Sequence, residues 1–314
     1  MYEAGHESEI LAACGGGHSS ALDFGGTDFC SCHTAEPPRT GRNLPELSSA
    51  ADHLSLVIEI GGIPVRVNTS DAGFLCLLQD RYAGFVGSSA NGEMEFAVDL
   101  TQQRFPDPDA HVRVTQRAGR WSLERGDFRA EWSPASCRGT IRQSANPYSI
   151  DAVLRIVHTL VLAKQGGFLL HAASAIRNGK AFVFAGVSGA GKTTIARLAP
   201  SDTTLLTDEI SYVRKQKEKY IAFGTPFTGE LAKLGENVSA PVAALYLLAK
   251  GSENRIEPIT QAEATRAFLA NVLFFAEDQE LVRLVFDSAI EFVSAVPVSR
   301  LTFVPDARVW ELIG

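Results

Sequence analysis

Residues 186–193, GVSGAGKT, have the residue types and the spacing of a loop that binds the phosphates of a nucleotide. They fit the pattern G-x₄-G-K-[ST] in full, between a strand-like run (KAFVFA) and a helix-like segment (TIARLAP). Glycines let backbone N–H groups surround phosphate oxygens, Lys192 brings a positive charge to the β and γ phosphates, and the Thr193 hydroxyl suits Mg²⁺. The residues expected to bind the nucleotide are Gly186, Val187, Ser188, Gly189, Ala190, Gly191, Lys192, Thr193 and Thr194.

An acidic pair, Asp208-Glu209, follows the next predicted strand, TTLLT. Only one short helix fits between Lys192 and this pair, whereas GTPase switches and ATPase motors generally place their magnesium aspartate further along the chain. A carboxylate at the end of a buried strand needs a cation or hydrogen bonds. Mg²⁺ held by Thr193 and Asp208 would meet that need, and a surface Asp-Glu turn is the alternative.

A histidine, His171, is expected to close the strand that precedes the loop strand. A lone histidine in a strand is more often packed than catalytic, but this strand should neighbour the loop strand and bring His171 near the γ-phosphate. Asn178-Gly179, between the two apolar runs, is a strong signal for a hairpin turn. We therefore expect the loop strand to be entered from an antiparallel hairpin and not from a βα crossover.

A helix is predicted from Tyr148 to Lys164, just before this hairpin, because its apolar residues follow helical spacing. Ser149 or Asp151 could cap its start, and Gly166-Gly167 should end it. A later helix is predicted over residues 261–276, with an aromatic stripe that favours a place in the core.

Residues 224–230, GTPFTGE, predict a glycine-bracketed loop on which Phe227 and Thr228 could close over nucleotide or acceptor, with a plain turn as the alternative. Glu230 is a further candidate ligand. Three arginines could reach the phosphates, and nothing in the sequence selects among them: Arg255, Arg266 and Arg300.

The stretch LLHAASAIRNGKAFVFAGVSGAGKTTIARL, followed by LLTDEISYV, resembles the HPr kinase/phosphorylase catalytic domain and, more closely, its HPr-kinase-like relatives. These include kinases encoded beside modified-peptide gene clusters and free-serine kinases, and ATP-dependent phosphoenolpyruvate carboxykinase shares the fold. The resemblance covers residues 147–314 and rests on His171, the phosphate loop and Asp208-Glu209, which stands where the family has Asp-Asp. It implies an α/β fold class: a P-loop kinase domain of the HPr kinase/carboxykinase type, with a mixed sheet and flanking helices.

The resemblance implies an ATP-dependent phosphotransferase with ATP and Mg²⁺ as cofactors. Its acceptor would be a hydroxyl group, with serine favoured, on a small protein, a peptide or a small molecule. The implied catalytic residues are Asp208, which takes the acceptor proton, His171, which assists, and Glu209, which could be base or ligand in place of Asp208. Relatives often form rings, so a homo-oligomer is one alternative, and the sequence leaves the oligomeric state open.

Two departures from the HPr kinases argue against HPr itself as the acceptor and against the reverse, pyrophosphate-forming reaction. Thr194 stands where those kinases carry an acid, and their Glu-Ile-Arg-Gly-like signature is absent, with GTPFTGE in the corresponding part of the chain. Two alternatives stay open: a nucleotide-binding sensor or regulatory module without phosphotransfer, and a carboxykinase-like enzyme.

Residues 53–145 show no nucleophile–base pair and no metal-ligand cluster. Residues 1–52 are rich in Gly, Ser, Pro and Thr and predict a disordered or weakly ordered tail, in which a zinc site at Cys30, Cys32 and His33 is a weak alternative. Residues 53–146 alternate as strands around a short helix in DAGFLCLLQDRYAGF and predict a small α+β accessory domain. Residues 147–314 form the predicted catalytic domain.

The composition is that of a soluble protein, with 45% hydrophobic and 21% charged residues and a formal net charge of −7. This charge disfavours nucleic acid and anionic membranes as partners. No apolar run reaches the roughly 18–20 residues of a membrane span, and the acidic N-terminus is not expected to be a secretory signal. Five cysteines without a disulfide-like pattern favour a reducing cytoplasm.

Overall fold

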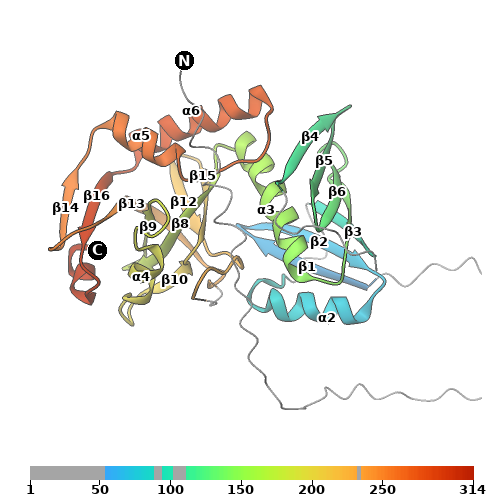
Figure 1. Ribbon diagram of the computed structural model, residues 1–314, viewed down its shortest axis with the longest axis horizontal. Helices are drawn as coiled ribbons and strands as arrows, with labels where there is room; N and C mark the ends of the chain where they lie inside the picture. Colours follow the sequence, from blue (N-terminus) through green and yellow to red (C-terminus); the bar gives the residue numbers. More distant parts are fainter. Residues whose placement is uncertain (1–53, 88–93, 102–110, 232–234) are drawn as a thin grey trace, which may run out of the picture. The chain divides into compact units, whose positions relative to one another are not determined.

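A computed structural model of the chain describes residues 54–87, 94–101, 111–231 and 235–314. Residues 53–314 form one compact unit. The predicted tail and its cysteines Cys14, Cys30 and Cys32 lie outside the described residues. The described part is a mixed α/β structure with two large sheets and few helices (Figure 1).

The first sheet has seven strands in the order β1-β2-β3-β7-β6-β5-β4. Its strands are β1 (Leu54–Ile60), β2 (Ile63–Thr69), β3 (Met94–Leu100), β4 (Arg113–Arg117), β5 (Arg120–Arg125), β6 (Phe128–Ser133) and β7 (Arg138–Gln143). All neighbours are antiparallel except β2–β3 and β3–β7, which are parallel. Gly61 and Gly62 form the turn between β1 and β2, and both residues have positive φ.

One helix, α2 (Ala72–Arg81), packs against β1 and β2, and a short 3₁₀ helix, η1 (Ala83–Phe85), follows it. This confirms the helix predicted in this segment. Asp71 caps α2 by accepting a 2.7 Å hydrogen bond from the Phe74 amide.

Helix α3 (Pro147–Lys164) confirms the predicted helix, but its cap differs from the prediction. Asn146 accepts a 2.8 Å hydrogen bond from the Tyr148 amide. Ser149 donates instead to Asp127 in the turn between β5 and β6, and Asp151 binds Arg81 of α2, so both side chains are used in tertiary contacts. Residues of α3 share one buried cluster with residues of both sheets. The predicted division at 146/147 separates the sheets, and it lies inside one compact unit.

The second sheet has nine strands, with the path β10-β8-β11-β12-β13-β16-β14 and with β9 and β15 paired beside it. Its strands are β8 (Phe168–Arg177), β9 (Lys180–Ala185), β10 (Thr204–Thr207), β11 (Ile210–Gln216), β12 (Lys219–Phe223), β13 (Ser239–Lys250), β14 (Arg255–Pro258), β15 (Val272–Leu273) and β16 (Val298–Phe303). Strands β8 and β9 form the antiparallel hairpin predicted from Asn178-Gly179, and both turn residues have positive φ. Strand β9 then pairs in parallel with β13.

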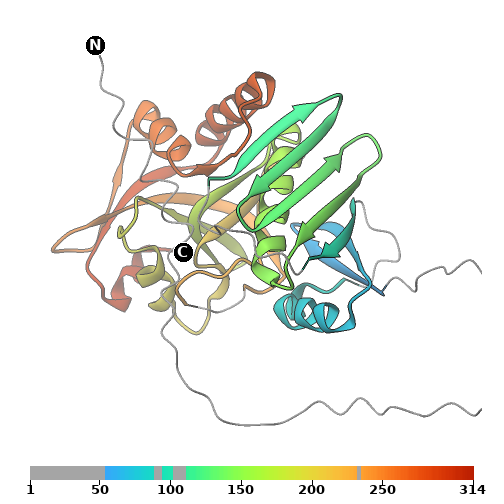
Figure 2. The same ribbon diagram turned by 45° about the vertical axis from the view of Figure 1, so that its right-hand side comes forward.

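The remaining helices are α4 (Lys192–Arg197), α5 (Gln261–Leu269), α6 (Gln279–Ala295) and the 3₁₀ helix η2 (Ala307–Leu312). Helices α5 and α6 lie side by side (Figures 1 and 2). The helix predicted over 261–276 is wrong beyond Leu269, because β15 leaves the helical path to pair with the edge of β8. The described part of the chain contains no helix with the length and apolar character needed to cross a bilayer.

Candidate active site

The glycine-rich loop connects the end of β9 to the start of α4. Gly189 and Gly191 have φ values of 74° and 111°, which favour glycine, and a Cβ at Gly191 would lie 2.7 Å from the Phe303 ring. Lys192 begins α4, and its Nζ donates to the backbone carbonyl oxygens of Gly186 at 2.8 Å and Val187 at 3.3 Å. The lysine therefore reaches back across the loop and places its charge inside it.

The acidic pair lies at a break between two strands. Strand β10 pairs with the second half of β8, and β11 pairs with its first half, so Asp208 and Glu209 occupy the two positions between them. His171 is opposite Ile210 in this register, and the Ala172 amide donates to the Glu209 carbonyl oxygen. The prediction that His171 closes its strand is wrong, because β8 continues to Arg177.

Asp208 is 3% exposed and holds the segment that follows β12. Its two carboxylate oxygens accept 2.9 Å hydrogen bonds from the backbone amides of Gly229 and Leu231. A Cβ at Gly229 would lie 2.8 Å from Asp208 Oδ2 and 2.9 Å from Glu209 Cβ. The GTPFTGE segment therefore contacts the acidic pair directly, through the hydrogen bond to Asp208 and the packing of Gly229.

Glu209 faces Arg155 of α3, with 3.8 Å between Glu209 Oε2 and Arg155 Nη2. The Arg155 guanidinium carbon lies 4.7 Å from the centroid of the Phe227 ring, over its face. Phe227 is 1% exposed and belongs to the buried core. The expectation that Phe227 closes over a ligand is therefore wrong: its ring supports an arginine from inside the fold.

Charge and burial link these side chains electrostatically. Burial, followed by the nearby Lys192 and Arg155 cations, lowers the pKa of His171 to about 4, so this histidine is neutral at pH 7. Burial raises the pKa of Glu209 against the opposing effect of the Arg155 cation. Burial also lowers the pKa of Lys192, with Glu209 and Glu230 acting in the opposite direction. His171, Lys192, Glu209 and Arg155 thus form one interacting group.

The arginine in this group is not one that the sequence suggested. Arg255 pairs with Glu253 and Glu257, Arg300 pairs with Glu263, and Arg266 is exposed. The only available signal for Arg155 was a charged residue inside an apolar helix, one turn after Asp151. Such a residue more often lies on a solvated face, so the contact across the fold could not be inferred.

The predicted Mg²⁺ ligands, Thr193 and Asp208, have a donor set that suits this ion. Mg²⁺ is commonly bound by one or two carboxylates together with substrate phosphates and water. Each Asp208 oxygen accepts one amide hydrogen bond and keeps a second acceptor position for a metal. No cluster of three or more His, Cys, Asp or Glu side chains arranged for a metal exists among the described residues.

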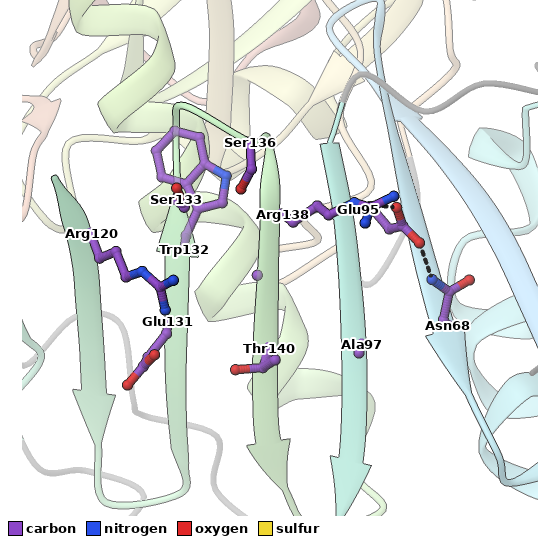
Figure 3. A pocket seen from close by; sticks show the side chains of 11 residues that line it. Asn68, Glu95, Ala97, Arg120, Glu131, Trp132, Ser133, Ser136, Arg138 and Thr140 are labelled. Atoms are coloured by element: carbon purple, nitrogen blue, oxygen red, sulfur yellow. Dashed lines mark hydrogen bonds and ion pairs between the residues drawn. The ribbon is translucent and has the colours of Figure 1, made fainter.

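A separate cavity of about 370 Å³ lies on the seven-stranded sheet (Figure 3). Arg120 of β5 and Glu131 of β6 line this cavity. Glu95 also lines it, accepts a 2.8 Å hydrogen bond from Asn68 and pairs with Arg138 at 3.1 Å. This cavity contributes no residue to the group around Lys192.

The fold and this geometry define a mixed α/β protein in which a glycine-rich strand–loop–helix segment lies beside an acidic pair at a strand break. The family model of the SynChlorMet cassette protein ScmC matches residues 140–314, which is more than half of the chain. The chain belongs to this family, and the matched residues include α3, the glycine-rich loop and Asp208-Glu209.

No curated protein matches the chain. Among solved structures, the chain is similar to the Hpr(Ser) kinase/phosphatase from Coxiella burnetii, with 12% sequence identity over 43% of this chain and 84% of the other. The TM-score is 0.23, which is too low to support a conclusion about fold or activity.

Proposed function

We propose that this protein is an ATP-dependent phosphotransferase that moves the γ-phosphoryl group of ATP to a hydroxyl group. The favoured acceptor is the hydroxyl of serine in a small protein, a peptide or a small molecule. The observation that supports this proposal best is the placement of Glu209, which interacts electrostatically with Lys192 of the glycine-rich loop and lies beside Asp208 at the strand break. A phosphate-binding loop with a carboxylate close to its lysine has both parts that phosphoryl transfer to a hydroxyl requires.

In this reaction the bond between the γ-phosphorus and the oxygen that bridges to ADP breaks. A bond forms between the acceptor oxygen and the phosphorus, and the proton of the acceptor hydroxyl passes to a carboxylate. The products are ADP and a phosphate monoester. Mg²⁺, when bound by Thr193 and Asp208 together with the nucleotide, supplies neutralisation of the phosphate charges.

The two acids divide these tasks in our proposal. Asp208 already accepts two backbone hydrogen bonds, so its first task is to hold the GTPFTGE segment and its second is to bind the metal. The Glu209 carboxylate accepts no hydrogen bond from the residues that the structure describes, so its oxygens are open to a proton, and burial raises its pKa. Glu209 therefore receives the acceptor proton, and neutral His171 is available as a hydrogen-bonding partner.

The nucleotide half of the proposal is tested by titration calorimetry with Mg·ATP. Lys192→Ala should weaken binding at least tenfold, because the ammonium that neutralises the phosphates is lost. Lys180→Ala, which removes an exposed lysine at the start of β9, is the matched control and should bind like wild type. Equal binding by wild type and Lys192→Ala would refute the assignment of the loop.

A further inference from the structure

Arg155 is a largely buried arginine in the proposed site that makes no hydrogen bond to the part of the chain that the structure describes. Its side chain is 18% exposed, and its Nε atom is buried without a partner. A guanidinium carries five N–H donors, and leaving such donors unsatisfied in a buried site costs free energy. The contacts of Arg155 therefore suit an anion that can accept several of these hydrogen bonds.

From these contacts we infer that Arg155 binds the phosphoryl group as it is transferred, an inference that rests on the proposed function. Arg155 Cζ lies 4.7 Å from the centroid of the Phe227 ring, and this contact supplies no oxygen or nitrogen acceptor for the guanidinium N–H groups. The ion pair with Glu209, at 3.8 Å, is too long to satisfy those donors as a hydrogen bond. A phosphoryl group offers oxygens in the geometry that the planar fork of an arginine binds in a bidentate manner.

The two cations of the site act on the same two side chains. Lys192 and Arg155 both contribute to the low pKa of His171, and both favour the ionised form of Glu209. Lys192 belongs to the loop that would hold the donor nucleotide, whereas Arg155 belongs to α3 and contacts the acid that would take the acceptor proton. A phosphoryl group that passes from donor to acceptor therefore moves from the lysine towards the arginine.

The position of Arg155 is fixed by contacts one helical turn earlier. Asp151 accepts hydrogen bonds from Arg81 Nε at 3.1 Å and Nη2 at 2.5 Å, and also from the Tyr82 hydroxyl. Arg81 is the last residue of α2. This helix therefore contacts α3 through the buried carboxylate of Asp151. Arg81 and Asp151 are positioning residues in this account, because they act on the phosphoryl group only through Arg155.

The test compares Mg·ATP with Mg·ADP, because only ATP carries the γ-phosphoryl group. In calorimetric titrations Arg155→Met should lose about tenfold or more in affinity for Mg·ATP and keep its affinity for Mg·ADP. Arg142→Met, which removes an exposed arginine of β7, should change neither value. If Arg155→Met does not fold, Arg155→Lys keeps the charge without the bidentate fork and should also lower the preference for ATP over ADP.

A positioning role for Arg81 predicts that Arg81→Met lowers the ATP preference in the wild-type background and has no further effect on it in Arg155→Met. An unchanged ATP-to-ADP affinity ratio in the folded Arg155 variants would overturn the inference. Failure of the proposed function is distinguishable. If the loop does not bind nucleotide, Lys192→Ala binds both nucleotides as tightly as wild type, and if only transfer fails, wild type binds Mg·ATP but forms no phosphorylated product.

Discussion

The Gly229 amide donates a 2.9 Å hydrogen bond to Asp208 Oδ1, and the glycine leaves no room for a side chain against the acidic pair. The GTPFTGE segment and the acids therefore form one packed unit, although they come from separate parts of the chain. The consequence is that the geometry of the acids depends on a residue without any side chain.

The first prediction concerns Gly229→Ala. The added Cβ would lie 2.8 Å from Asp208 Oδ2, so the segment or the acid must move. We expect phosphotransfer to fall at least tenfold and the free energy of unfolding to fall by about 1–3 kcal/mol. Chemical denaturation and a transfer assay measure the two effects.

Gly84→Ala is the matched control, because a Cβ there meets nothing within 4 Å and the glycine does not have the positive φ that strains other residues. Its stability should stay within about 0.5 kcal/mol of wild type. If both alanine variants behave alike, the packing of Gly229 against the acids has no functional consequence.

The second prediction separates the two acids. Asp208→Asn replaces one acceptor oxygen by an NH₂ group that faces a backbone N–H group. The free energy of unfolding should therefore fall by about 1–3 kcal/mol, and phosphotransfer should also be lost. Glu209→Gln should lose transfer with a smaller loss of stability and with Mg·ATP binding retained. Denaturation at pH 7 and calorimetry provide the comparison. An Asp208→Asn variant as stable as wild type contradicts the anchoring role, and a fully active Glu209→Gln contradicts its role as base.

The third prediction concerns pH and His158, a fully buried residue of α3 whose Nδ1 lies 2.9 Å from the Tyr212 hydroxyl. Burial, followed by the Arg214 cation, lowers its pKa from 6.5 to about 3. The unfolded chain therefore binds this proton at a higher pH than the folded chain. The stabilisation from neutral His158 is complete above pH 6.5 and decreases by about 1.4 kcal/mol per pH unit as the pH falls towards 3.

His171, with a pKa of about 4, contributes with the same sign, whereas the raised pKa of Glu209 contributes with the opposite sign. His158→Gln removes one titrating group and keeps a polar side chain. The slope of unfolding free energy against pH between 6 and 4 should therefore be smaller in this variant than in wild type. Identical slopes would show that His158 does not titrate as its burial indicates.

Much of the second sheet could be predicted from local signals. The Asn178-Gly179 turn determined the β8–β9 hairpin, and the apolar spacing of α3 matched a helix that packs against both sheets. These features depend on residues close together in sequence, whose backbone preferences and periodicity act locally.

The features that failed to be predicted depend on distant partners. The α3 cap is Asn146 because Ser149 binds the turn between β5 and β6 and Asp151 binds α2. The helix predicted over 261–276 ends early because β8 offers an edge for β15. Arg155 could not be placed in the site without knowing that Phe227 lies beneath it. Sequence alone therefore indicated the loop and the acids but not the contacts that orient them.

The central claim is tested most directly by a ³¹P NMR time course of Mg·ATP with the full chain. Separate samples contain L-serine, a seryl peptide or a small protein with an exposed serine as acceptor. We predict that the γ-phosphate resonance is replaced by ADP and a phosphate-monoester resonance with at least one acceptor, and that Glu209→Gln forms none. Binding of Mg·ATP without any monoester would contradict the claim and favour a nucleotide sensor.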